Sequence, residues 1–248
     1  MAKIDKSQYS KEQWRIIREQ RRIQKRKQKN LQKQHNISTV VSQPQTDIVN
    51  KNNNKIAFVL GNGTSRKSID ILELQKIGPV YACNAVYRTH TPDYLVAVDV
   101  KMILEINKSG YQKNNKVWTN PNKAYDKIKN LNYFQPSKGW SSGPTALWLA
   151  SQHRYEKIYI LGFDFKGLDS GKKFNNLYAD SINYKKSTDG ATFFGNWLRQ
   201  TKTVIREHSE INYFRVITSD NYQPPELNTC TNLQMLELED FRKIYQLS

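Results

Sequence analysis

The sequence has few of the residues that bind metals or form disulfide bonds. Its 248 residues include two cysteines, Cys83 and Cys230, and four histidines. The two cysteines do not have the spacing of zinc ligands, which argues against a structural zinc site. We therefore expect both thiols to stay free, as in a reducing compartment.

Long apolar runs are also missing. No run approaches the ~18 residues that a membrane span requires. The chain is charged from its third residue and lacks the apolar segment of a secretory signal. The mean hydropathy is −0.76, while 38% of the residues are hydrophobic and 11% are aromatic. We expect a cytoplasmic protein with no membrane span, built from one full domain and an accessory segment.

Positive charge is abundant and unevenly spread. The net charge is +17 at pH 7, and residues 1–54 contain 13 of the 39 Lys and Arg but only 4 of the 22 Asp and Glu. This asymmetry indicates an anionic partner, although it also keeps a chain soluble. The richness in Lys, Asn and Ile is typical of AT-rich genomes, which accounts for part of the basicity without any binding.

Residues 1–35 predict a basic helical arm. Ser10 and Gln13 form a capping-box pattern at the start of a helix over about residues 10–34, which neither Gly nor Pro interrupts. The helix is polar on nearly all sides, so it is marginal unless it docks on a partner. We predict salt-sensitive binding to nucleic acid or docking into a larger assembly, with a solvated tail as the alternative. The residues expected to make these contacts are Arg18, Arg21, Arg22, Lys25, Arg26 and Lys29.

Residues 36–54 predict a flexible polar linker, and residues 55–248 predict a Rossmann-like α/β domain. Residues 55–60 form a short apolar run that ends at a glycine, which is typical of a buried parallel strand. Strand-like and helix-like segments then alternate, which predicts a mostly parallel sheet with helices on both faces. The expected strands are 80–83, 94–98, 116–119, 132–134, 157–161 and 213–217, and the expected helices are 68–76, 101–107, 145–153, 195–208 and 236–245.

Residues 61–65, here called the glycine loop, read Gly61-Asn62-Gly63-Thr64-Ser65 and follow the first strand directly. Ligands of parallel sheets collect at the carboxyl ends of the strands. The glycines permit close approach of a ligand, and backbone N–H groups at the start of the next helix bind anions. The loop is neither a Walker motif nor a full dinucleotide fingerprint, so a plain tight turn is the alternative to a phosphate site.

Polar residues also follow the other strands. Asn84 is placed to bond a base or sugar, and Asp99 is placed for a ribose hydroxyl or a metal. Ser142 and Asp99 could instead cap the helices that follow them. Because the same pattern recurs at several strand ends, we predict a nucleotide site. Its residues are Gly61, Asn62, Gly63, Thr64, Ser65, Asn84, Asp99, Ser141, Ser142, Gly143 and Asp164.

Over about residues 55–165 this set of motifs resembles the family 42 bacterial sialyltransferases. It equally resembles the broader group of 6-hydroxymethylpterin pyrophosphokinase-like Rossmann proteins. The sialyltransferase resemblance implies a nucleotide sugar as partner, with the cytidine nucleotide held by Asn62, Gly63, Ser65, Asn84, Ser142, Gly143 and Asp164. Small proteins of this kind occur in tailed phages, which implies a phage origin and a place in the host cytoplasm or the virion.

Those sialyltransferases use a histidine as general base. None of the histidines in this sequence follows a motif that aligns with it. We expect all four histidines at the surface, namely His35, His90, His153 and His208. Tyr178 and Tyr184 are candidates for steadying a departing phosphate, and Asp180 or Asp189 could replace the base. These two tyrosines and two aspartates lie in the long polar segment 167–190. The segment occupies the place of an active-site lid, and the alternative is that it is a solvated loop without a special role.

Two classes of function stay open. The first is a nucleotide-sugar-dependent glycosyltransferase, or a pyrophosphotransferase that would need Mg²⁺ on Asp99 and Asp164. The second is a non-catalytic phage structural or nucleic-acid-binding protein. Such a protein would keep the Rossmann-like shell and use the basic arm at residues 1–35 to dock.

Overall fold

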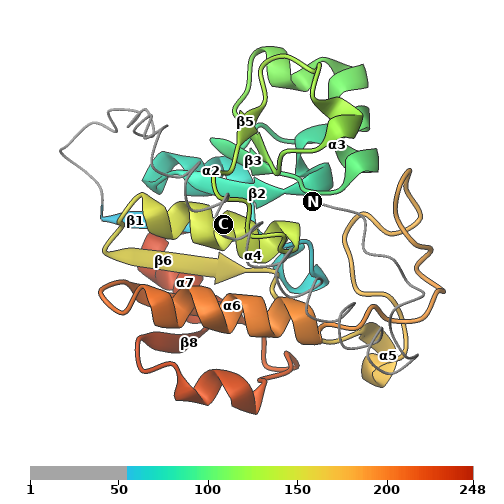
Figure 1. Cartoon of the computed structure of the whole chain (residues 1–248). Coiled ribbons are helices and arrows are strands. Elements are labelled where there is room, and N and C mark those ends of the chain that lie inside the picture. Colours follow the sequence, from blue (N-terminus) through green and yellow to red (C-terminus); the bar gives the residue numbers. More distant parts are fainter. Residues whose placement is uncertain (1–54, 248) are drawn as a thin grey trace, which may run out of the picture. The chain divides into compact units, whose positions relative to one another are not determined.

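The computed structural model describes residues 55–247, which form one eight-stranded, fully parallel sheet flanked by helices (Figure 1). The spatial order of the strands is β5-β4-β3-β2-β1-β6-β7-β8. The predicted Rossmann-like α/β class is therefore confirmed. The strands are β1 (Ile56–Leu60), β2 (Val80–Cys83), β3 (Tyr94–Val96), β4 (Val117–Thr119), β5 (Asn132–Tyr133), β6 (Lys157–Leu161), β7 (Asn212–Ile217) and β8 (Leu233–Glu237).

Helices connect the strands. The α-helices are α2 (Ile71–Ile77), α3 (Val100–Ser109), α4 (Ser142–Gln152), α5 (Leu168–Gly171), α6 (Gly195–Glu207) and α7 (Leu238–Tyr245). The short 3-10 helices are η2 (Thr64–Arg66), η3 (Asn84–Arg88), η4 (Tyr111–Lys113), η5 (Lys123–Tyr125) and η6 (Pro225–Thr229). Across residues 55–247, none of these helices has the length and apolar character to cross a membrane.

The basic arm, residues 1–35, and the linker, residues 36–54, lie outside the described residues. The contacts predicted for Arg18, Arg21, Arg22, Lys25, Arg26 and Lys29 therefore stay predictions.

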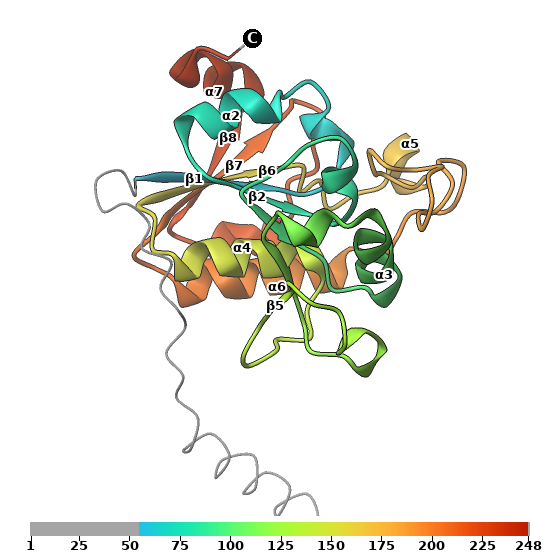
Figure 2. The same ribbon diagram turned by 90° about the horizontal axis from the view of Figure 1, so that it is seen from above.

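Helices cover both faces of the sheet, as Figure 2 shows with the sheet seen edge-on. On one face Val59 of β1 belongs to a core with residues of α4 and α6, such as Leu147 and Val204. On the other face Phe58 packs in a core with Leu74 of α2 and Phe241 of α7. Because β1 is buried on both faces, its sequence is a continuous apolar run rather than an alternating one.

The strand order changes direction at β1. Strands β2 to β5 lie on one side of it, and β6 to β8 lie on the other. β1 and β6 are paired in register from Ile56↔Lys157 to Leu60↔Leu161, so both strands end at the same level. The chain leaves these two strands toward opposite sides, which opens a crevice at this topological switch point.

Strand β8 was not predicted, and the last helix begins at Leu238 rather than at residue 236. The segment before Leu238 contains Leu, Gln, Met and Glu, which are good helix formers, so local propensity favours a helix. Five register pairs with β7, from Tyr213↔Leu233 to Ile217↔Glu237, make it a strand instead. Strand formation depends on the neighbouring strand more than on propensity.

Not all of the histidines within residues 55–247 lie at the surface. His208 is 9% exposed, and its Nδ1 lies 2.9 Å from the carbonyl oxygen of Val204. Its Nε2 lies 2.8 Å from the amide nitrogen of Gln152. The prediction of a surface position is therefore wrong for His208, because the end of α6 packs against α4 there. Cys83 and Cys230 are both buried, and both are free cysteines.

Candidate functional site

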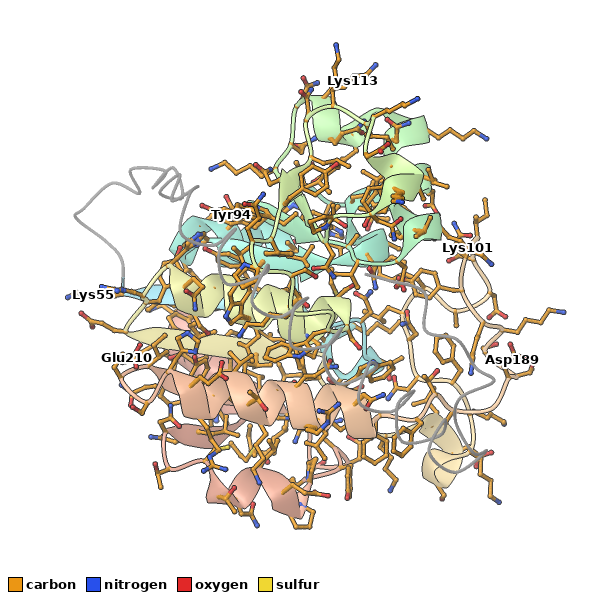
Figure 3. The ribbon with its side chains drawn as sticks, in the orientation of Figure 1. Lys55, Tyr94, Lys101, Lys113, Asp189 and Glu210 are labelled. Atoms are coloured by element: carbon orange, nitrogen blue, oxygen red, sulfur yellow. The ribbon has the colours of Figure 1, made fainter. Side chains whose placement is uncertain are left out.

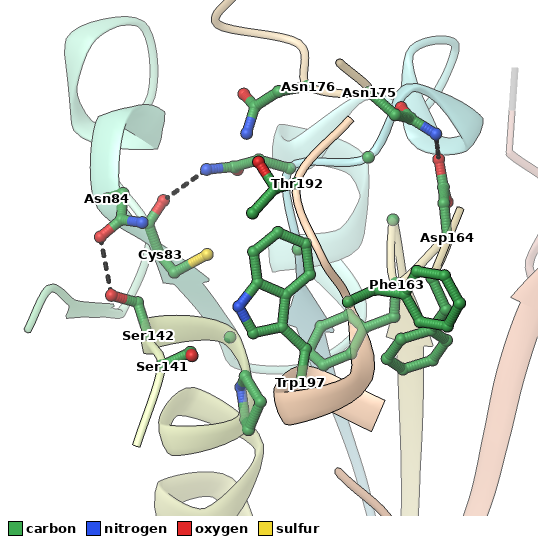
Figure 4. A pocket seen from close by; sticks show the side chains of 18 of the residues that line it. Cys83, Asn84, Ser141, Ser142, Phe163, Asp164, Asn175, Asn176, Thr192 and Trp197 are labelled. Atoms are coloured by element: carbon green, nitrogen blue, oxygen red, sulfur yellow. Dashed lines mark hydrogen bonds between the residues drawn. The ribbon is translucent and has the colours of Figure 1, made fainter. Parts of the chain in front are cut away.

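A cavity of about 320 Å³ opens at the topological switch point (Figure 4). This volume lies at the lower end of the range of small-ligand pockets. Every predicted nucleotide-binding residue lines it except Thr64 and Ser65. The predicted residues in its wall are Gly61, Asn62, Gly63, Asn84, Asp99, Ser141, Ser142, Gly143 and Asp164.

The backbone donors of the glycine loop are already bonded to other parts of the chain. The Thr64 N–H donates to Oδ1 of Asn175 at 2.9 Å, and the Ser65 N–H donates to Oδ2 of Asp164 at 3.2 Å. The Ser65 hydroxyl also donates to the Asp164 carboxylate. The start of η2 is where the sequence predicts a phosphate. In the structure the carboxylate of Asp164 occupies this position.

The glycines of this loop are explained by the close approach of the loop that follows β6. A Cβ on Gly61 would overlap the carbonyl oxygen of Gly162, and a Cβ on Gly63 would overlap the carboxylate of Asp164. Gly162 itself has a φ of +70°, a conformation that glycine adopts without strain. The two glycines are therefore needed for contact between two loops, whether or not a ligand binds.

The side chains of Asn62 and Arg66 hold the glycine loop in its conformation through hydrogen bonds. Arg66 is 5% exposed; its guanidinium donates to the carbonyl oxygen of Gly61 and, at 3.2 Å, to Oδ1 of Asn62. The Asn62 amide donates to the carbonyl oxygen of Cys83 at 3.3 Å, which ties β1 to β2. Both side chains therefore hold the loop in place.

The Cys83 thiol also lines the cavity, and it donates to the carbonyl oxygen of Leu60 at 3.5 Å. Burial raises the pKa of this thiol to about 12. A thiol with so high a pKa stays protonated at neutral pH, and the protonated form is a poor nucleophile. Cys83 is therefore a wall residue and not a covalent catalyst.

A chain of hydrogen bonds positions Asn84. The Val98 N–H donates to the Ser142 hydroxyl oxygen at 3.2 Å, and that hydroxyl donates to Oδ1 of Asn84 at 2.8 Å (Figure 4). Asn84 has a φ of +55°, in the left-handed region that non-glycine residues adopt at an energetic cost. Because its oxygen is engaged by Ser142, its amide nitrogen remains as a donor at the cavity wall.

The N-terminus of α4 borders the cavity through Ser141, Ser142 and Gly143. Ser141 is the N-cap residue, and its side chain makes no capping bond; Ser142 does not cap the helix, since its hydroxyl bonds Asn84. The first backbone bond of the helix runs from the Thr145 N–H to the Ser141 carbonyl oxygen. The N–H groups of Ser142 and Gly143 therefore have no acceptor within residues 55–247 and carry the positive end of the helix dipole.

The two aspartates of the predicted site have different surroundings. Asp164 is 7% exposed, and besides Ser65 it receives a hydrogen bond from the Asn175 amide at 3.0 Å. Asp99 is exposed, and its carboxylate makes no capping bond to α3 and no other hydrogen bond among the described residues. Because Asp164 already accepts three hydrogen bonds, two from Ser65 and one from Asn175, its carboxylate is less available than that of Asp99 to the Mg²⁺ predicted on these two residues. Asp99 is the carboxylate that is open to a ligand.

One wall of the cavity is aromatic, and sequence reasoning missed it. The indole of Trp197, at the start of α6, stands between the Ser142 side of the cavity and the Phe163 side (Figure 4). Trp197 does not follow a strand, so a search of strand ends does not find it. Other wall residues outside the predicted set include Phe163, Phe165, Phe174, Asn175, Asn176, Thr192 and Phe194.

The structure does not bring the predicted catalytic residues Tyr178, Tyr184, Asp180 and Asp189 into the cavity wall. The Tyr184 hydroxyl lies behind the wall, where it accepts the Asn62 amide and the Ala85 N–H at 3.4 Å each. Burial raises the pKa of Tyr184 above its ordinary value. Tyr178 packs partly buried beside Tyr184, with ring centroids 5.9 Å apart.

Asp180 and Asp189 are exposed and serve turns of their own segment. The Asp180 carboxylate accepts the Ser187 N–H at 3.0 Å, and the Asp189 carboxylate accepts the Lys186 N–H at 2.8 Å. Figure 3 shows Asp189 at the outer side of this segment, away from the strands. Neither aspartate reaches the cavity, so neither is placed to act there as a base.

Segment 167–190 is anchored rather than freely solvated. The Arg88 guanidinium donates to the Ser181 hydroxyl and to the Ile182 carbonyl oxygen, each at 2.7 Å, and pairs with Glu105 at 2.7 Å. The Asn183 amide donates to Glu105 at 2.6 Å. This group of contacts, here called the Arg88–Glu105 clasp, holds the segment beside the cavity.

We expect Arg88→Ala to loosen segment 167–190 and to lower the free energy of unfolding by about 2 kcal/mol, because several partly buried partners lose a charged donor. The rate of tryptic cleavage at Lys185 and Lys186 would measure the loosening and should rise. Urea denaturation would measure the loss of stability. The matched control is Lys173→Ala, which removes an exposed ion pair with Asp169 and should cost about 0.5 kcal/mol or less. Equal cleavage rates in both variants would contradict the clasp.

The clasp should also depend on pH. Burial acts to raise the pKa of Glu105, but hydrogen bonds from Arg88, Tyr87 and Asn183 outweigh it and hold the pKa below its usual value. A carboxylate with a lowered pKa stabilises the fold above its unfolded pKa of about 4.3, and this contribution is lost as the pH falls through the folded value. The difference in stability between the wild-type protein and Arg88→Ala should therefore shrink in acid.

The fold and the site together define a Rossmann-like α/β protein with a polar and aromatic cavity at its switch point. No protein-family model matches the chain, and the search of curated proteins finds no match. The functional argument therefore depends on the geometry of this cavity.

Proposed function

We propose that this protein binds a nucleotide or nucleotide sugar in the switch-point cavity and acts as a glycosyltransferase. The observation that carries the proposal is the meeting of three features at one cavity. These are the uncapped N-terminus of α4, the positioned amide of Asn84 and the indole of Trp197. Open α/β sheets bind ligands at this place in the fold.

The phosphate groups would lie at the start of α4. The N–H groups of Ser142 and Gly143 point out of the first turn, and anions are stabilised at such a helix end. The amide nitrogen of Asn84 adds a side-chain donor, since its oxygen is bonded to Ser142. This position differs from the glycine loop, whose Thr64 and Ser65 donors are bonded to Asn175 and Asp164.

The base or the sugar would lie against Trp197. Indole rings stack on nucleobases and on the apolar faces of sugars. Asp99, on the loop after β3, would accept hydroxyl groups of the ligand, because its carboxylate has no partner among residues 55–247. These contacts favour an anionic, polyhydroxylated ligand with a flat ring.

In the transfer, an acceptor hydroxyl attacks the anomeric carbon of the donor sugar. The new C–O bond forms as the bond to the phosphate oxygen breaks, and its electron pair leaves with the nucleotide phosphate. The proton of the acceptor is released to water at the open side of the cavity, because Asp99 lies next to Val98 and Ser142, on the side of the departing phosphate. The N-terminus of α4 stabilises the departing phosphate. No step is routed through Mg²⁺, since the oxygens of Asp164 are taken by Ser65 and Asn175.

Calorimetry with CTP, CMP, UDP and GTP, with and without Mg²⁺, tests the proposal. We expect at least one nucleotide to bind, and Trp197→Ala to weaken it about tenfold or more through lost stacking. Phe193→Ala is the matched control, because Phe193 is a nearby aromatic residue that is 77% exposed and does not line the cavity. The proposal fails if the wild-type protein binds none of the four nucleotides.

A further inference from the structure

A second cavity adjoins the first. Its volume is about 750 Å³, and it opens at the same edge of the sheet, between the start of η2 and the loop after β7. Its wall is formed by Thr64, Ser65, Lys67, Ser68, Asp164, Lys166, Gly167, Leu168, Asp169, Ser170, Asn175, Thr218, Asp220, Asn221, Tyr222 and Leu238. Leu168 and Leu238 are the only aliphatic side chains in this wall, so the surface is strongly polar.

The two cavities share part of their walls. Asp164, Lys166, Gly167 and Asn175 line both of them. The Asn175 amide donates to the Asp164 carboxylate at 3.0 Å and to the Lys166 carbonyl oxygen at 2.9 Å, which holds the wall together. A ligand in the second cavity would therefore lie close to a ligand in the first.

The wall of the second cavity contains both hydrogen-bond donors and hydrogen-bond acceptors. The hydroxyls of Ser68, Ser170 and Tyr222 make no hydrogen bond with any described residue. Asn221 uses its oxygen to accept the Thr218 N–H at 2.9 Å, which leaves the amide nitrogen as a donor. Interspersed donors and acceptors of this kind suit a ligand that carries many hydroxyl groups.

An aromatic ring and an ammonium group complete this surface. The Lys166 ammonium lies 5.7 Å from the centroid of the Tyr222 ring. The Lys166 side chain is exposed, so it can move aside from the ring or donate to a ligand hydroxyl. The ring supplies an apolar face for the C–H groups of a sugar.

We infer that the second cavity binds a carbohydrate, the acceptor whose hydroxyl is glycosylated at the first cavity. This inference rests on the proposed function, because it uses the first cavity as the donor site. The sugar lies among Tyr222, Asn221 and Ser170. It directs one hydroxyl across the Lys166–Gly167 part of the shared wall toward the donor.

Saturation-transfer-difference NMR on the full chain tests this site, with methyl β-galactopyranoside, methyl α-glucopyranoside and lactose as probes at millimolar concentration. We expect transfer to at least one probe and about a tenfold lower affinity in Tyr222→Ala. Tyr222→Phe keeps the ring and its contact with Phe194, so it should keep part of the affinity. Trp197→Ala is the reverse control, since it should weaken nucleotide binding and leave the glycoside signal unchanged.

No transfer to any of the three probes, or equal transfer in the wild-type protein and Tyr222→Ala, would overturn the inference. Loss of both nucleotide and glycoside binding in Trp197→Ala would also overturn it, because the two sites would then not be separate. If the wild-type protein binds a glycoside but no nucleotide, the proposed transferase fails and a carbohydrate site remains. The two failures can therefore be told apart.

Discussion

Replacing Gly61 by alanine is expected to lower the free energy of unfolding by about 3 kcal/mol, at the upper end of the usual cost of overpacking. The added Cβ would overlap the backbone oxygen of Gly162 and lie 2.8 Å from the ring of Phe163. A backbone atom cannot rotate away as the end of a flexible side chain can. The loops after β1 and β6 would have to separate, and they form the floor of the cavity.

Urea denaturation of Gly61→Ala and Gly190→Ala would measure this effect. Gly190 is the matched control, because a Cβ there meets nothing within 4 Å and its φ is outside the left-handed region. Its substitution should change stability by about 0.5 kcal/mol or less. Similar stability losses in the two variants would show that the close approach at Gly61 is not what requires glycine. Nucleotide binding should also fall in Gly61→Ala and stay unchanged in Gly190→Ala.

Replacing Asp164 by alanine is expected to cost about 3 kcal/mol, because a buried carboxylate that accepts several hydrogen bonds is removed. The Ser65 N–H, the Ser65 hydroxyl and the Asn175 amide all lose their acceptor. Burial lowers the pKa of the nearby Arg215 to about 10, and the negative charge of Asp164 opposes this. Without Asp164 the charge of Arg215 is therefore less compensated.

The same variant tests what occupies the glycine loop. Removal of the carboxylate frees the Ser65 N–H at the start of η2, where an inorganic anion can replace it. Added sulfate should therefore raise the melting temperature of Asp164→Ala more than that of the wild-type protein. Asp169→Ala, which removes an exposed carboxylate, is the control and should respond as the wild-type protein does. An equal response of all three proteins to sulfate would argue against an internal anion at this loop.

Local pattern was enough to predict most of the sheet. The run at residues 55–60 and the run at residues 157–161 are apolar on both faces because the strands they form are covered on both faces. A polar or glycine residue ends each run, which marks the strand ends and hence most of the cavity wall. Strand β8 escaped prediction, since its residues favour a helix until β7 lies beside them.

The site was predicted less completely than the sheet. Asn84, Asp99 and Ser142 follow strands or open a helix, so the rule for strand ends finds them. Trp197 comes from the start of α6 and Asn175 from segment 167–190, and no strand end points to either. The aspartates at 180 and 189 looked suitable by chemistry alone, but turns within their own segment hold them away from the cavity.

The glycine loop separates what the sequence by itself determined from what only the tertiary structure decided. The sequence determined a tight turn after β1 at an edge of the sheet where ligands collect, because apolar periodicity and glycine placement are local properties of the chain. The tertiary structure decided which donors are free. The N–H groups of Thr64 and Ser65 are bonded to Asn175 and Asp164, about a hundred residues further along the chain, while those at the start of α4 remain open. Whether a polar group is satisfied depends on such distant partners, which local sequence does not reveal.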